Sequence, residues 1–233
     1  GVLTSYDGKT AYAVTADAAA QLVLDGVEEV LPFAFYANKS VMSVALPDAV
    51  TIGKKAFYNS NVIAVNIGAN CTSVGEYALS NEAATMYVTL SATTPPTVLD
   101  GTFVGSTKFA GKIFVPQEAM DAYKTAPVWS TFAADMYVKP EQDREIVQLG
   151  NWLMWSDGEF IDYTGEFTFD GTEVLTLPKE LTTLPDSLAV SIFKLTATNA
   201  NQTKVSFAVE EGNVAFKIKD GVLMSADEKT VYG

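Results

Sequence analysis

One short pattern occurs three times between Leu22 and Leu90: LVLDGVEEVLPFAFY (22–36), VALPDAVTIGKKAFY (44–58) and VNIGANCTSVGEYAL (65–79). Its apolar anchors keep a constant spacing, because Val30, Ile52 and Val74 are 22 residues apart, as are Phe35, Phe57 and Leu79. A fixed period of this length is typical of stacked repeats, in which each unit buries an apolar edge only against its neighbours. The pattern therefore predicts a stack of repeats.

Within each repeat, the residues around Leu24, Leu46 and Ile67 alternate in the way expected of half-buried parallel strands. We expect one row of side chains to point into the core: Leu22, Leu24, Val44, Leu46, Val65, Ile67, Val88 and Leu90. The other row forms an outward ribbon: Val23, Ser43, Ala45, Ala64, Asn66, Tyr87 and Thr89. Three members of this ribbon, Ser43, Asn66 and Tyr87, are candidate partner-binding residues. After each strand we expect one turn of helix that carries Phe35, Phe57 or Leu79 as a wedge.

The segments at both ends of the stack predict secondary structure that differs from that of the repeats. Asp7-Gly8 lies between two short apolar runs and predicts a β-hairpin with a type I′ turn that caps the first repeat. Beyond Ser91 the period stops, and the sequence predicts an extended crossing at 94–97, a strand at 112–116, helices at 117–124 and 130–133, and a strand at 136–138. Atypical ends of this kind are needed because the last repeat would otherwise expose its apolar edge.

These segments resemble the BspA-type leucine-rich repeat family together with its C-terminal closing unit. The resemblance rests on VTIGKKAFYNS (50–60), TPP (94–96), IFVP (113–116), DAYK (121–124) and WSTF (129–132), and it covers roughly residues 1–138. It implies a right-handed solenoid on secreted or surface-anchored proteins of host-associated bacteria, with roles in adhesion and protein binding. An extracellular or cell-surface location is implied in the same way.

The predicted fold class is α/β and strand-rich, with a solenoid over 1–138 that has short helical turns and a helical closing unit. A polar, proline-containing linker at 139–145 precedes a mostly-β segment at 146–233. This segment begins with a β-meander rich in aromatic residues, whose last strand we expect at 166–170, and a degraded repeat follows at 174–188. Trp152, Trp155, Phe160 and Tyr163 cluster in the meander.

The end of the sequence repeats its beginning, since residues 221–232 match residues 1–12 at eight of twelve positions. At the first copy this hairpin leads into the repeats. We therefore expect the chain to be a piece of a longer tandem protein.

Composition excludes several classes of function. The 233 residues carry a formal charge of −13 and contain no histidine. Nucleic acid and anionic lipid need clustered cations, so neither is an expected partner, and no apolar run is long enough to span a membrane. Without histidine, the commonest general base and metal ligand are missing. The single cysteine, Cys71, cannot form an intrachain disulfide and is interpreted as a buried repeat residue. We predict no cofactor and no metal site.

Several short motifs resemble catalytic or metal-binding patterns, but each has a simpler structural interpretation. Ser191 and Lys194 have the S-x-x-K spacing of penicillin-recognising enzymes, but the companion motifs are missing. The Asp-Gly pairs, including Asp100-Gly101, Asp157-Gly158, Asp170-Gly171 and Asp220-Gly221, lack the calcium-loop pattern and indicate turns. Adjacent acids at Glu28-Glu29 and Glu210-Glu211 face opposite ways and indicate solvated surface.

The leading hypothesis is a non-enzymatic surface or secreted module for adhesion or protein–protein interaction. One alternative is a carbohydrate-binding accessory module that uses exposed aromatic rings at Trp152, Trp155 and Tyr163, because such rings stack on sugar faces. The simpler interpretation is that these rings form the core of a small β-unit. A further alternative is a spacer in a longer surface protein.

Overall fold

A computed structural model describes residues 1–80, 86–99, 101–103, 111–140, 144–167, 172–193 and 205–232. The chain divides into two compact units, Gly1–Ile146 and Val147–Gly233. This division falls at the end of the predicted linker 139–145, of which 141–143 lie outside the described residues. The predicted domain boundaries stay a prediction.

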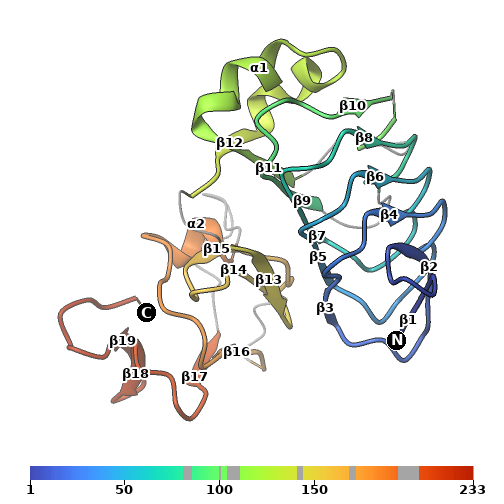
Figure 1. Ribbon diagram of the computed structural model, residues 1–233. Coiled ribbons are helices and arrows are strands. Elements are labelled where there is room, and N and C mark those ends of the chain that lie inside the picture. Colours follow the sequence, from blue (N-terminus) through green and yellow to red (C-terminus); the bar gives the residue numbers. More distant parts are fainter. Residues whose placement is uncertain are drawn as a thin grey trace. The chain divides into compact units, whose positions relative to one another are not determined.

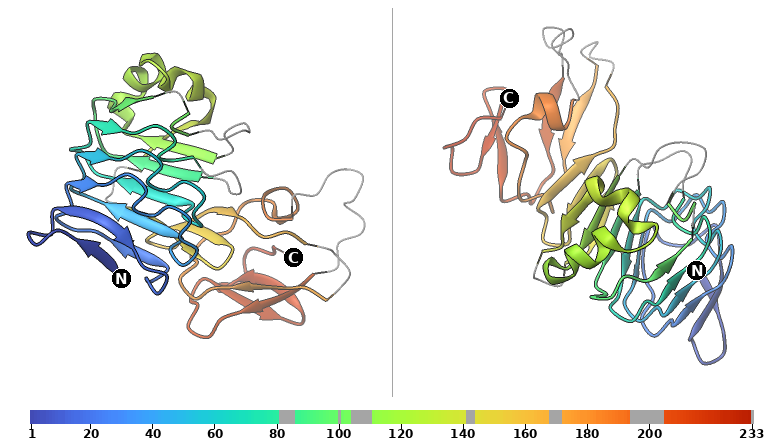
Figure 2. Two further views of the ribbon diagram at one scale, coloured as in Figure 1. Left: turned by 90° about the vertical axis from the view of Figure 1, so that its right-hand side faces the viewer. Right: turned by 90° about the horizontal axis from the view of Figure 1, so that it is seen from above.

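The first unit contains two six-stranded sheets (Figure 1). The first has the order β1 (Val2–Thr4), β2 (Thr10–Val14), β4 (Glu29–Val30), β6 (Thr51–Ile52), β8 (Ser73–Val74) and β10 (Thr97–Val98). The second has the order β12 (Met136–Val138), β11 (Gly111–Val115), β9 (Met86–Leu90), β7 (Ala64–Ile67), β5 (Ser43–Leu46) and β3 (Gln21–Val23). Each repeat therefore supplies one strand to each sheet, and successive repeats lie side by side (Figure 2).

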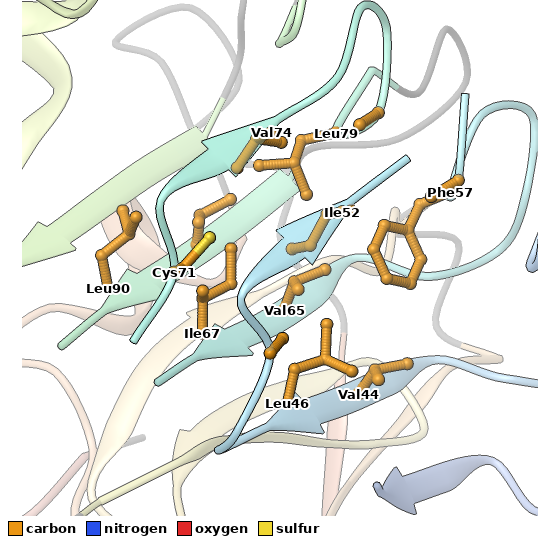
Figure 3. Packing of buried hydrophobic residues seen from close by; sticks show 14 of the residues in the cluster. Val44, Leu46, Ile52, Phe57, Val65, Ile67, Cys71, Val74, Leu79 and Leu90 are labelled. Carbon is orange, nitrogen blue, oxygen red and sulfur yellow. The ribbon is translucent and has the colours of Figure 1, made fainter. Parts of the chain in front are cut away.

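The strand register aligns equivalent positions of successive repeats. Val44 pairs with Val65, and Val65 with Val88, in parallel strands of the second sheet. In the first sheet Ile52 pairs with Val74. Because the apolar positions meet one above another, they form one continuous core between the sheets (Figure 3). All the predicted inward residues belong to this core or pack against it.

The connections between the sheets are tight turns, where the sequence predicted one turn of helix. The backbone N–H of Lys55 donates to the Glu76 carbonyl (2.9 Å), and that of Phe57 to the Ala78 carbonyl (3.0 Å). Both acceptors belong to the next repeat, whereas an α-helix uses the carbonyl four residues earlier. Two residues of this turn, Lys55 and Asn59, have positive φ values of 55° and 56°. The prediction of a turn of helix is wrong, because only alternate N–H groups bond within the turn: those of Ala56 and Tyr58 donate to the carbonyls three residues earlier (3.2 and 3.3 Å).

Close stacking explains two glycines of the pattern. A Cβ on Gly53 would lie 2.3 Å from the backbone nitrogen of Pro32, and a Cβ on Gly75 would lie 2.6 Å from that of Lys54. Both positions follow the first-sheet strand of their repeat and are 22 residues apart. Glycine is required there because the backbone of the preceding repeat occupies the place of a side chain.

The predicted N-terminal hairpin is confirmed, with β1 antiparallel to β2 and β2 parallel to β4. Its turn is not type I′, which needs two residues with positive φ. In the turn only Gly8 has positive φ (75°), and its N–H donates to the Ser5 carbonyl (2.9 Å). The Asp7 carboxylate accepts hydrogen bonds from the Ser5 hydroxyl (2.6 Å) and the Lys9 N–H (3.1 Å). These side-chain bonds stabilise the turn and hold the pKa of Asp7 below its usual value.

Helices follow the last long strand of the first unit, near the predicted positions. They are η1 (Gln117–Ala119), α1 (Met120–Thr125) and η2 (Trp129–Asp135), and β12 follows them. The indole N–H of Trp129 donates to the Pro96 carbonyl (2.8 Å), and the Tyr123 hydroxyl donates to the Ala92 carbonyl (2.9 Å). These buried bonds fix the helices to the extended segment around Pro96.

From Ile146 onward, the described residues form three small sheets. They contain β13 (Ile146–Leu149), β14 (Trp152–Trp155) and β15 (Phe160–Tyr163); β16 (Val174–Leu177) and β17 (Ser206–Val209); and β18 (Phe216–Lys219) and β19 (Val222–Ser225). A short helix, α2 (Leu188–Ser191), lies between β16 and β17 in the sequence. The order β13-β14-β15 agrees with the predicted meander, while residues 168–170 of its expected last strand lie outside the described residues. The parallel pairing of β16 with β17 is the pairing that repeat strands make in the first unit.

Candidate protein-interaction surface

The outward residues of the second sheet are buried, with the exception of Val23. We call the six buried residues the strand face, and their exposed fractions are Ser43 4%, Ala45 3%, Ala64 0%, Asn66 9%, Tyr87 2% and Thr89 1%. The alternation was predicted correctly, because none of them belongs to the core cluster between the sheets. Three candidate partner-binding residues, Ser43, Asn66 and Tyr87, lie on this face, and their role in binding stays a prediction.

The Asn66 side chain forms hydrogen bonds within the chain. Its side-chain amide donates to the Ile146 carbonyl (3.1 Å), and its carbonyl oxygen accepts from the Ile146 N–H (2.8 Å). A primary amide can satisfy one backbone N–H and one backbone C=O in this way. Asn66 thus ties the last residue of the first unit to β7.

The aromatic residues proposed for sugar stacking are largely buried. Trp152 and Trp155 are each 4% exposed, and Tyr163 is half-buried. The Trp152 indole donates to the Thr176 carbonyl (2.8 Å), and its ring meets that of Tyr163 edge-on at 5.0 Å between centroids. Trp152 belongs to the core of the second unit, against which Tyr163 packs. The structure therefore supports the simpler interpretation for Trp152 and Tyr163.

A different group of aromatic residues is accessible, on the turns of the first unit. We call Phe33, Tyr36, Tyr58 and Tyr77 the aromatic strip. Phe33 and Tyr36 are 51% and 47% exposed, while Tyr58 and Tyr77 are half-buried. All four flank the buried wedges, at two residues before or one residue after Phe35, Phe57 or Leu79. Since the turns of successive repeats stack, their flanking residues come side by side.

The rings of the strip form a continuous series. Phe33 meets Tyr36 edge-on at 5.6 Å, Tyr36 stacks on Tyr58 at 6.1 Å with planes 9° apart, and Tyr58 meets Tyr77 edge-on at 6.3 Å. These separations suit favourable aromatic pairs. The Lys55 ammonium lies 4.8 Å from the Tyr58 centroid and 5.6 Å from that of Tyr77.

The backbone also fixes the strip. Phe33, Lys55 and Tyr77 occupy equivalent places, and their φ values are 65°, 55° and 57°. Positive φ is uncommon for such side chains and persists only where the surrounding structure imposes it. Here the stacked turns impose it, so the rings are presented by a rigid backbone. Binding to a rigid surface costs less side-chain and backbone entropy.

The sequence contains a signal for this strip. Tyr36 and Tyr58 are 22 residues apart, so they share the period of the buried wedges that precede them. A large aromatic side chain at a repeated position next to a core wedge points to a ladder of rings. The strand alternation drew attention to the opposite side of the repeat.

The burial or exposure of the other candidate reactive residues that the structure describes agrees with a structural role. Burial of Cys71 confirms its interpretation as a core residue and raises the pKa of its thiol to about 11. Glu28, Glu29, Glu210 and Glu211 are all exposed. Lys194, Asp100, Asp170 and Gly171 lie outside the described residues, so the motifs that contain them have no structural account.

In the parts of the chain that the structure describes, no group of three Asp, Glu or Cys side chains is arranged to hold a metal ion. No helix in the same parts is both long and apolar enough to cross a bilayer.

The first unit is thus a stack of parallel-strand repeats that presents a row of aromatic rings on its turns. Residues 18–116 match the BspA type leucine rich repeat region, in six copies. The resemblance inferred from the sequence is confirmed over these residues. The family is typically non-enzymatic and associated with surface and protein-interaction roles. No curated protein matches the chain.

Proposed function

We propose that this chain is a non-enzymatic module of a secreted or surface-displayed bacterial protein, and that it serves adhesion or another protein–protein contact. In this proposal residues 1–138 form a right-handed solenoid, and the helices after β11 close it. Two observations support it: the BspA-type repeats at 18–116 and the aromatic strip on their turns. The strip carries the argument, because it is the feature whose chemistry suits a partner.

The strip has the composition of a protein-binding hot spot. Tyrosine is enriched at such sites because its ring buries a large area at a small entropic cost, while its hydroxyl can find a polar partner. Tyr36 and Tyr58 are stacked, and the Lys55 ammonium lies over the Tyr58 ring, which adds a cation to the strip. We therefore propose a protein ligand that places apolar and acidic groups against these rings.

The residues named from the sequence remain candidates for binding. Partner binding by Ser43, Asn66 and Tyr87 stays a prediction. Glycan binding by Trp152, Trp155 and Tyr163 also stays a prediction, but Trp152 belongs to the second unit's core and Tyr163 packs against that core. A spacer role would leave the strip without a function.

The proposal can be tested by binding to a panel of purified extracellular-matrix proteins immobilised on a sensor surface. We expect at least one protein to bind the full chain, and the double substitution Tyr36→Ala and Tyr58→Ala to weaken that binding about 100-fold, as for loss of two hot-spot residues. Tyr6→Ala is the matched control, because Tyr6 is fully exposed at a hairpin tip away from the strip.

Several results would contradict the proposal. Equal binding by the wild type and the double variant would exclude the strip as the contact. Loss of binding on enzymatic removal of glycans from the bound protein would favour the carbohydrate alternative. A complete absence of binding across the panel would favour the spacer.

A further inference from the structure

The two copies of the hairpin have the same turn. Ser5, Asp7, Lys9 and Thr10 of the first copy correspond to Ser225, Asp227, Lys229 and Thr230 of the second. In the second copy the Asp227 carboxylate accepts from the Ser225 hydroxyl (2.7 Å) and the Lys229 N–H (3.1 Å). The Thr230 N–H donates to the Ser225 hydroxyl oxygen (3.0 Å), as that of Thr10 does to Ser5 (3.0 Å). The copies are therefore structural equivalents, and the contacts of one can be compared with those of the other.

The strand position that is buried in one copy of the hairpin is exposed in the other copy. In the first copy Ala11 is buried against the repeats, while Leu3 is 59% exposed. In the second copy Val231, the equivalent of Ala11, is 65% exposed, while Leu223, the equivalent of Leu3, is fully buried.

The strand pairing explains this reversal. The first copy pairs through β2 with the parallel repeat strand β4, and the second pairs through β19 with the antiparallel strand β18. The hairpin thus has two strand edges that can pair with another strand. Each copy shows which strand pairs with one of these edges.

The first copy also shows which groups a repeat strand contacts. The Lys9 carbonyl accepts from the N–H groups of Glu28 (2.8 Å) and Glu29 (3.0 Å), and the Ala11 carbonyl accepts from that of Leu31 (3.0 Å). The Lys9 ammonium forms an ion pair with the Glu28 carboxylate (2.6 Å). The second copy offers the same groups at Lys229 and Val231.

We propose that the edge formed by Lys229, Thr230, Val231 and Tyr232 is a docking site for the first parallel strand of a second copy of the repeat stack. The occupant has the chemistry of Glu28-Glu29-Val30, with an acidic residue opposite Lys229 and a β-branched residue beside Val231. The ammonium of Lys229 is exposed, and among the described residues it pairs with the neighbouring Asp227 (3.2 Å), so it is within reach of such a strand. The hairpin then joins a preceding unit to a following stack, independently of the partner bound by the aromatic strip.

An extended protein tests this proposal. Residues 14–146 are appended after Gly233, which corresponds to Ala13, so that a second stack follows the second hairpin as the first stack follows the first. Hydrogen exchange is measured at residues 230–232 in the full chain and in the extended protein. We expect exchange at Val231 to slow at least about tenfold in the extended protein, because pairing protects the amide.

Variants separate docking from other causes. Val231→Asp should restore fast exchange in the extended protein, whereas Val231→Ala, which copies Ala11, should keep it slow. Equal exchange in the full chain and the extended protein would overturn the proposal, and so would slow exchange that survives Val231→Asp. Concentration-dependent protection of Val231 in the original full chain would show that the edge pairs with another molecule's edge, which also overturns the proposed occupant.

Discussion

The strand face and the aromatic strip lie on the same repeats, yet they differ in what they offer to a partner. Ser43, Asn66 and Tyr87 of the strand face are at most 9% exposed, and Asn66 is bonded to Ile146. On the strip, Phe33 and Tyr36 are about half exposed. The comparison teaches that an outward position in a strand pattern means only exclusion from the core between the sheets. It does not mean access to solvent.

The largest expected effect concerns the wedge next to the strip. Phe57 is fully buried and packs against Phe35 at 4.7 Å between ring centroids, so Phe57→Ala should lower the free energy of unfolding by about 3–5 kcal/mol. Its neighbour Tyr58 is half-buried, and Tyr58→Ala should cost only about 1 kcal/mol. Urea unfolding followed by circular dichroism measures both. Similar losses for the two variants would show that the strip is part of the core.

A smaller effect is expected on the strand face. Asn66→Ala removes both partners of the Ile146 backbone groups, and leaving them unsatisfied should cost about 1–3 kcal/mol in the same unfolding measurement. Asn61→Ala is the control, because the exposed Asn61 amide makes a single bond to the Lys39 carbonyl (3.0 Å) and water can replace it. If Asn66→Ala were as mild as the control, Asn66 would be free to contact a partner.

Chemical modification probes access to both surfaces in one experiment. Tyr36 should be nitrated by tetranitromethane about tenfold faster than Tyr87, because a buried ring reacts only through local opening. Tyr123, which is fully buried in the first unit, is the internal control for a protected ring. Peptide mapping by mass spectrometry gives the rates. Fast nitration of Tyr87 alongside slow nitration of Tyr123 would restore the strand face as an accessible surface.

Much of the fold of the first unit could be predicted, because its hydrophobic anchors recur at a fixed spacing in the sequence. The spacing of Val30, Ile52 and Val74 gave the stack, and alternation around Leu46 and Ile67 gave the core side of each strand. The turns could not be predicted in the same way. Lys55 and Phe57 donate to the next repeat, and local sequence does not distinguish that bond from one to the carbonyl four residues earlier.

The sequence by itself determined the repeat register, the core side of the strands, the burial of Cys71 and the duplication of the hairpin, because each depends on residue type at a fixed spacing. Only the tertiary structure decided which outward side chains are accessible. Asn66 meets Ile146 across 80 positions of the chain, and Tyr36 meets Tyr58 only because their turns stack. The opposite exposure of Ala11 and Val231 has the same origin, since equivalent residues in equivalent hairpins are covered by different neighbours.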